Sequence, residues 1–176
     1  NYGLNNIVIG NDTITETNLI RRKWLNNDFG GFTYSLNHKM GDLDLTFGGA
    51  NSTYSGQHYG NVIWAQYSGN ASLNHQYYWN KAEKLDNNFF AKANYKYSES
   101  TQVYIDLQRR IIDYVFEGLD ANGNPAEQEI NLQFFNPKFG LHHTLNKNQV
   151  IYASFGVANK EPNRTDYTES SADSRP

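Results

Sequence analysis

The sequence predicts an all-β fold of antiparallel, up-and-down β-hairpins, with about six strands. Apolar and polar residues alternate with period two over long segments, and helical periodicity is nearly absent. Three tight turns separate these segments, whereas the other connections are long and polar. Short turns on one side and long loops on the other are typical of outer-membrane barrels. We therefore expect a partial slice of a transmembrane β-barrel.

The first predicted hairpin begins with one long strand from Thr17 to Lys39. The strand contains polar and glycine-rich interruptions at residues 26–28 and 30–31, which we interpret as a bulge because a turn there would break the order of turns and loops. The turn follows at Met40-Gly41-Asp42. Apolar residues alternate with polar ones on both sides of it, at Phe32, Tyr34, Leu36, Leu43, Leu45 and Phe47.

The second hairpin is centred on Ser98-Glu99-Ser100. Its first strand, predicted from Leu85 to Ser98, places one set of apolar residues on a single face: Leu85, Phe89, Ala91, Ala93, Tyr95 and Tyr97. Its second strand places Val103, Ile105 and Leu107 on one face and polar residues, including Arg110, on the other.

Arg109 interrupts this pattern, because it falls on the apolar phase after Leu107. The apolar residues then move to the opposite phase, at Ile112, Tyr114 and Phe116. An arginine facing lipid at mid-membrane costs about 2–4 kcal/mol. Of two alternatives, a phase-resetting bulge and an Arg109 at the outer membrane interface, we favour the bulge.

The third hairpin joins the segment from Phe134 to Leu141 with a strand that starts at Gln149, through Asn146-Lys147-Asn148. The long polar loops are expected at Ser68 to Lys84, at Leu119 to Glu129, and from Lys160 onward. On the barrel interpretation, the turns face the periplasm and the loops face outside.

Composition limits the function. The 176 residues are 38% apolar with a mean hydropathy of −0.75, and no run approaches the 18 to 20 apolar residues of a spanning helix. A net charge of −3 without a basic block argues against nucleic-acid binding. The chain has no cysteine, so disulfides and thiolate metal sites are excluded. Its ends lack a signal segment or closing structure, which suggests a piece excised from a longer protein.

Two loop segments are candidates for ligand contact. Tyr77-Tyr78-Trp79 would stack on a flat or sugar-like ligand, or would pack on other loops. Arg164, near Glu161 and Asp166, would contact a ligand or would fix its loop by ion pairing, and the structural role is the better supported.

His142 and His143 are adjacent on a strand and point to opposite faces, so they predict no metal site. We expect no cofactor, and no catalytic constellation predicts an enzyme.

Four segments carry a resemblance to a known family. They are residues 19–29 (LIRRKWLNNDF), residues 48–65 around Tyr54-Ser55-Gly56-Gln57-His58-Tyr59-Gly60, Phe135-Asn136-Pro137-Lys138, and Glu161-Pro162-Asn163-Arg164-Thr165-Asp166-Tyr167. In this order and spacing they resemble the barrel of TonB-dependent outer-membrane receptors, particularly those of Bacteroidetes. The similarity covers almost the whole chain.

The resemblance implies an active importer in the outer membrane of a Gram-negative bacterium. Its barrel of about 22 strands would be plugged by an N-terminal domain and driven through TonB. The cargo would be a siderophore, cobalamin, a glycan or another scarce nutrient, with Tyr77, Tyr78, Trp79, Arg164 and Tyr167 as extracellular ligand contacts. Residues 1–176 would be a barrel fragment without plug or TonB box, in contact with outer-membrane lipid. Alone, the fragment is expected to self-associate through its open edges.

Two alternatives remain from the sequence. A soluble carbohydrate-binding β-sandwich has the same composition and period, but it predicts short loops at both ends. A passive porin-like channel differs from a receptor only in lacking a plug and a TonB box.

Overall fold

The computed structural model describes residues 2–120, 123–163 and 166. The prediction of an all-β fold of antiparallel hairpins is confirmed. The strands are β1 (Ile7–Ile9), β2 (Asp12–Ile14), β3 (Leu19–Met40), β4 (Leu43–Ala65), β5 (His75–Lys96), β6 (Thr101–Gly118), β7 (Gln128–Asn146) and β8 (Gln149–Gly156). β1 and β2 form a small hairpin of their own, which the sequence did not predict.

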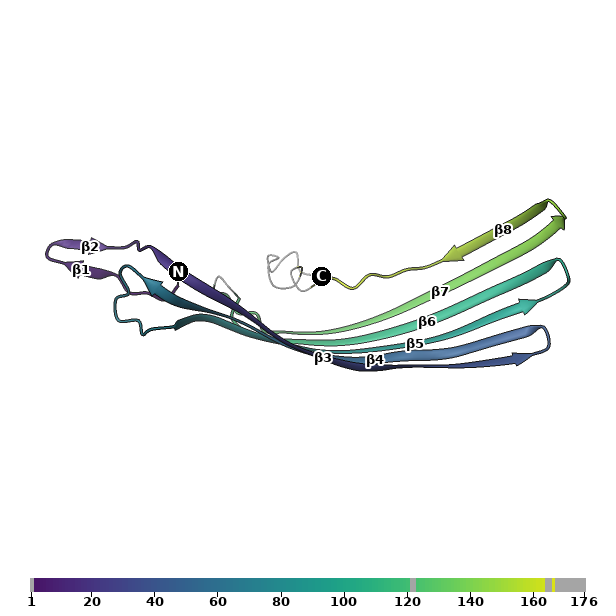
Figure 1. The fold of residues 1–176 in the computed structure, drawn as a ribbon, viewed down its shortest axis with the longest axis horizontal. Helices are drawn as coiled ribbons and strands as arrows, with labels where there is room; N and C mark the ends of the chain where they lie inside the picture. Colours follow the sequence, from purple (N-terminus) through teal and green to yellow (C-terminus); the bar gives the residue numbers. More distant parts are fainter. Residues whose placement is uncertain (1, 121–122, 164–165, 167–176) are drawn as a thin grey trace. The chain divides into compact units, whose positions relative to one another are not determined.

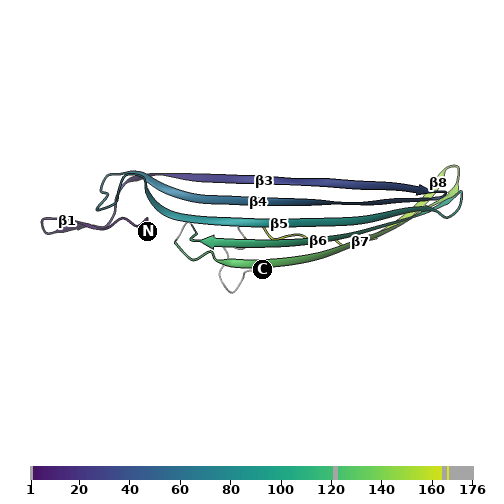
Figure 2. The ribbon, with the colours of Figure 1, turned by 90° about the horizontal axis from the view of Figure 1, so that it is seen from below.

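The main sheet contains six strands in the order β3-β4-β5-β6-β7-β8 (Figures 1 and 2). Each strand is therefore hydrogen-bonded to its neighbours in the chain, as in an up-and-down meander. β3 and β8 are the edge strands, so the sheet is open rather than closed into a barrel.

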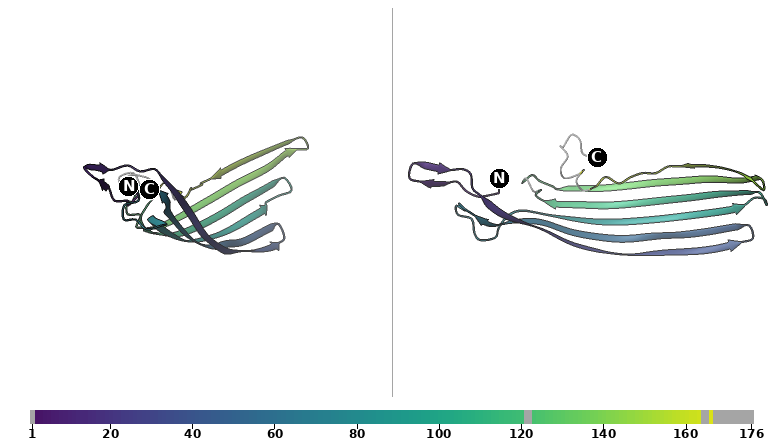
Figure 3. Two further views of the ribbon diagram at one scale, coloured as in Figure 1. Left: turned by 60° about the vertical axis from the view of Figure 1, so that its left-hand side comes forward. Right: turned by 45° about the horizontal axis from the view of Figure 1, so that its top comes forward.

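The three predicted tight turns are confirmed, and they lie at one end of the sheet (Figure 3). Gly41 follows β3 with φ of 57°, a conformation that glycine adopts without steric cost. In the β7–β8 turn, the backbone N–H of Asn148 donates to Oδ1 of Asn146 at 3.0 Å. The hairpins are joined near their turns, since the N–H of Lys96 donates to the carbonyl of Asp42 and the N–H of Thr144 to that of Ser100.

The strands are longer on the loop side than the sequence predicted. β3 runs without a break through residues 26–31, close to the expected range of Thr17 to Lys39. The predicted loop from Ser68 to Lys84 is wrong, because β5 already begins at His75. Tyr78, Asn80 and Ala82 alternate with more exposed residues and are buried, which identifies this segment as a strand. The loop after Gly118 lies close to its predicted position.

The chain divides into two compact units, and the long strands contribute to both. Unit 1 comprises residues 1–29, 54–83 and 114–129, and unit 2 comprises residues 30–53, 84–113 and 130–176. The buried apolar side chains of unit 1 are Val62, Tyr78, Ala82, Tyr114, Phe116 and Ala126. Gly60 leaves room for the aromatic rings there, because a Cβ at this position would collide with Cε1 of Tyr78.

In unit 2, large apolar side chains are exposed, whereas some polar side chains are buried. Asp106 and Asn136 are buried, whereas large apolar residues of all six strands are more than a third exposed. We call the face that carries most of the second group the apolar face; it includes Tyr34, Phe47, Phe89, Leu107, Phe139, Leu141 and Phe155, whereas Tyr152, which pairs with His142, lies on the opposite face. The opposite, polar face carries Asp86, Asn88, Asp106, Gln108, Arg110 and Asn136.

The expected bulge near Arg109 is wrong. Along β6 the buried residues Asp106, Ile112, Tyr114 and Phe116 all have even numbers, so one alternation continues without a reset. The polarity of each phase changes instead. The phase of Asp106 becomes apolar from Ile112 onward, and the phase of Leu107 becomes mixed, with Arg109, Asp113 and Glu117 separated by Ile111 and Val115.

β7 shows the same exchange in the opposite chain direction. Its even phase passes from Ile130, Leu132 and Phe134 to Asn136 and Lys138, while its odd phase passes from Glu129, Asn131 and Gln133 to Phe135, Phe139 and Leu141. Hydrogen bonds join the polar residues just beyond the apolar face. Arg109 Nη2 donates to Gln133 Oε1 at 3.1 Å, and Asn131 Nδ2 donates to Asp113 Oδ1 at 2.5 Å.

Candidate functional site

A chain of amide side chains crosses the polar face of unit 2, from β5 to β7. Gln108 Nε2 donates to Asn88 Oδ1 at 3.2 Å, and Asn136 Nδ2 donates to Gln108 Oε1 at 3.1 Å. Gln108 therefore both donates and accepts, and its amide links the three strands β5, β6 and β7. The buried position of Asn136 is therefore explained by its partners.

The segment after β8 lies against this face, and we call residues 157–163 the strap. Its first residue continues the pairing with β7, because the N–H of Val157 donates to the carbonyl of Pro137 at 2.9 Å. The backbone N–H and Nδ2 of Asn159 then both donate to Oδ1 of Asn136, at 3.0 and 2.8 Å. The strap is thus bound to the polar face before it reaches Glu161.

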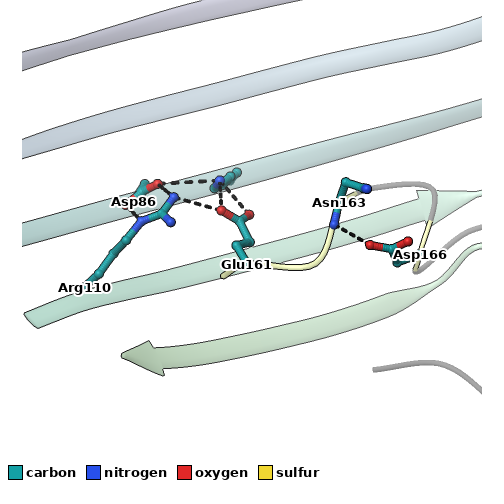
Figure 4. Close-up of polar contacts among 6 residues, drawn as sticks. Asp86, Arg110, Glu161, Asn163 and Asp166 are labelled. Carbon is teal, nitrogen blue, oxygen red and sulfur yellow. Dashed lines mark hydrogen bonds and ion pairs between the residues drawn. The ribbon is translucent and has the colours of Figure 1, made fainter. Parts of the chain in front are cut away.

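Glu161 joins an ion-pair cluster with residues of β5 and β6 (Figure 4). Lys84 Nζ lies 2.7 Å from Glu161 Oε1, and Arg110 Nη2 lies 2.8 Å from Oε2. Arg110 also donates to both carboxylate oxygens of Asp86, through Nε at 3.0 Å and Nη2 at 2.5 Å. The four side chains are between 15% and 27% exposed, so solvent screens these pairs less than it screens surface pairs.

A second polar group lies on the same face, around Asp106. Tyr104 donates its hydroxyl to Asp106 Oδ2 at 2.9 Å, and Lys92 Nζ lies 4.0 Å from the same oxygen. The other oxygen, Oδ1, is buried and has no hydrogen-bond partner among the described residues. An unpaired buried carboxylate oxygen is costly, so this position is a candidate site for a donor such as water.

The aromatic candidates of the sequence lie on β5 and not in a loop. Tyr78 is only 6% exposed, and Tyr77 packs against it with ring centroids 5.0 Å apart. Tyr2 packs edge-on against Tyr77 at 4.9 Å, and the carbonyl of Trp79 accepts from the N–H of Leu119 at 2.8 Å. These contacts support the packing interpretation of Tyr77-Tyr78-Trp79. The other candidates, Arg164 and Tyr167, lie outside the described residues.

The structure brings together residues that the sequence did not connect. For Glu161 the geometry agrees with loop fixation by ion pairing, but the partners are Lys84 and Arg110. The sequence did contain a signal for the contact between Asp86 and Arg110, because both residues lie on the polar phase at similar distances from the Glu99 turn. No periodic signal pointed to Glu161, because the strap lies outside the strands.

Among the described residues, no group of three or more His, Cys, Asp or Glu is arranged to hold a metal ion. His142 pairs with Tyr152 and His143 with Ile151 across β7 and β8, and Nδ1 of His143 lies 2.8 Å from the Thr101 hydroxyl. The described part of the chain contains no helix with the length and apolar character needed to cross a membrane.

The chain matches none of the protein-family models in a family scan, and a search of curated proteins likewise gives no match. Chemically, the polar face offers amide hydrogen-bonding groups and one compact, charge-balanced cluster.

Proposed function

We propose that this chain forms part of the wall of an outer-membrane β-barrel, with its apolar face toward lipid and its polar face toward the lumen. The observation that carries the proposal is the exchange of polarity along β6 and β7. A barrel wall meets hydrocarbon over a limited band only, so its outward phase should be apolar within that band and polar beyond it. β7 has this pattern apart from His143 within the band, and on β6 the charged residues Arg109, Asp113 and Glu117 enter the outward phase beyond Leu107, between Ile111 and Val115.

The length of the apolar phase fits a bilayer. On β7 it runs from Phe135 to Leu145 with His143 as its one polar member, which at about 3.3 Å per residue corresponds to about 33 Å along the strand. A strand tilted by about 40° would cover about 25 Å of membrane depth, the height of the apolar band in such barrels. Arg109 and Gln133 would then lie at the outer interface, where a charged group costs little.

The exposure of the apolar face argues against the soluble β-sandwich. A sandwich buries its apolar face under a second sheet. In unit 2, Phe89, Phe139 and Leu141 are each more than 40% exposed, and no second sheet covers them in the described part of the chain. In lipid the same exposure would be favourable.

The more specific proposal, a TonB-dependent receptor for active uptake of a scarce nutrient, is supported by the resemblance of the four quoted segments. Plug and TonB box would belong to the parent protein, outside these 176 residues. A receptor of this kind could carry a siderophore, cobalamin or a glycan as its cargo. The packing of Tyr77 and Tyr78 within unit 1 makes them poorer candidates for ligand contact than the residues around Arg164 and Tyr167.

Spin labelling tests the membrane orientation, and the absence of cysteine makes single-cysteine variants simple to prepare. Lys138→Cys and Phe139→Cys are neighbours on opposite faces of β7. Each variant is labelled with a nitroxide and inserted into phospholipid vesicles. The label at position 139 should then be accessible to oxygen dissolved in the lipid, and the label at position 138 to a water-soluble nickel reagent. Gln133→Cys should resemble position 138 because it lies beyond the band. Equal accessibility of all three positions would refute the orientation.

Uptake by cells tests the receptor proposal separately. If the parent protein is a TonB-dependent receptor, uptake of its cargo should stop when the proton gradient is collapsed or TonB is deleted. Uptake that continues under both conditions would identify a passive, porin-like channel and would leave the orientation in the membrane unaffected.

A further inference from the structure

The carboxylate of Glu161 is held like a bound ligand on the polar face of unit 2. Its two oxygens lie within 2.7 and 2.8 Å of Lys84 Nζ, and Oε2 also lies 2.8 Å from Arg110 Nη2. Its side chain is 15% exposed. Both cations belong to strands of the sheet, whereas the carboxylate belongs to the strap, which has no regular secondary structure.

The basic half of this arrangement is preorganised without Glu161. Asp86 accepts from Nε and Nη2 of Arg110, and this bidentate contact fixes the plane of the guanidinium. Lys84 lies 3.5 Å from Asp86 Oδ2 on the same strand. Lys84 and Arg110 carry two positive charges and Asp86 carries one negative charge, so these three side chains together carry a net charge of about +1.

We propose that Lys84 and Arg110 form a carboxylate-binding site, and that Glu161 is its resident ligand and is exchangeable with a free carboxylate anion. Binding of Glu161 holds the strap on the polar face, and its release frees the site for the external ligand. The inference does not rest on the membrane orientation, because it concerns only contacts within the polar face of unit 2. A carboxylate is favoured over other anions because it is the group that the site already holds.

The first experiment measures how firmly the strap is held. Glu161→Gln preserves the size of the side chain but removes its charge. Hydrogen exchange of the amides of Val157 and Asn159, which bind Pro137 and Asn136, should become at least about tenfold faster in the refolded 176-residue chain. Amides of the β7–β8 ladder should be unaffected. Glu127→Gln, at an exposed loop position, is the matched control and should leave both sets unchanged.

The second experiment tests the ligand. In a Glu161→Ala chain, acetate titrated at constant ionic strength should shift the Arg110 Nε–Hε NMR signal and saturate with a Kd of about 1–20 mM. The wild-type chain, whose site is occupied, should respond at least tenfold more weakly, and so should the Glu161→Ala, Lys84→Met variant. Acetate should also leave the β7–β8 amides unchanged, which excludes a general effect on folding.

Unchanged exchange of Val157 and Asn159 in Glu161→Gln would overturn the resident-ligand role. An acetate response that is the same with and without Lys84 would overturn the binding site. Since Glu161→Gln is isosteric and lies outside the strands, its result stands even if the alanine variant were to fold poorly, and protection of the β7–β8 ladder in each sample reports the fold.

Discussion

If the apolar face lies toward lipid, as proposed, the same substitution should have different costs at two adjacent positions of β7. Leu141 lies on the apolar face near the middle of the apolar phase and is 44% exposed, and His142 lies on the polar face and is also exposed. Leu141→Arg should cost about 2–4 kcal/mol of folding free energy in lipid vesicles, the cost of arginine at the bilayer midplane. This corresponds to a roughly 30- to 900-fold loss in the folding constant. His142→Arg should change it by no more than about 0.5 kcal/mol.

The assay is equilibrium denaturation of the 176-residue chain by guanidinium, in phospholipid vesicles and in lipid-free buffer. Because Leu141 is already half exposed, a sheet that faces water on both sides should tolerate both arginines about equally. The decisive quantity is therefore the difference between the two variants in vesicles. If Leu141→Arg and His142→Arg are equally destabilising there, or if Leu141→Arg costs as much in buffer as in vesicles, the apolar face does not face hydrocarbon.

Three further predictions concern packing and association. Phe116→Ala should lower the free energy of unfolding by about 3–5 kcal/mol, because Phe116 is 2% exposed. A loss below about 1 kcal/mol in equilibrium denaturation would contradict its core position. Val115→Ala, at the neighbouring position, is the control. Gly60→Leu should cost at least about 1–3 kcal/mol because its Cβ would collide with Tyr78, whereas Gly30→Ala, with open space around its Cβ, should leave the melting temperature within a few degrees. In lipid-free buffer, sedimentation velocity should show dimers or larger species, because β3 and β8 leave free edges; a stable dilute monomer would count against this.

The hairpins were predictable because their determinants are local. The Gly41 and Lys147 turns join segments of clear alternation, and period two fixes which residues share a face. The start of β5 was not predictable in the same way. Tyr77, Tyr78 and Trp79 are aromatic on both phases, so the sequence shows no alternation there, and the strand is identified by the alternating burial of Tyr78, Asn80 and Ala82 in the structure.

The candidate site was half predictable. Asp86 and Arg110 occupy the polar phase on either side of a short turn, so a contact between them follows from hairpin geometry. Glu161 reaches the same cluster from 51 residues beyond Arg110. Its position depends on where the strap crosses the face, which is set by Asn159 and Asn136. Such contacts of irregular segments have no periodic signature in the sequence.

Arg109 shows what alternation can and cannot distinguish. A change of the apolar residues from odd to even positions has two physical causes: an inserted residue that turns the strand over, or a change in what each face meets. In the first case the buried residues should change parity, and in the second they should keep it. Along β6 they keep it, from Asp106 to Phe116. The character of the two faces therefore changes near Arg109 without a change of phase, and under the proposed function this change would mark the boundary between hydrocarbon and water.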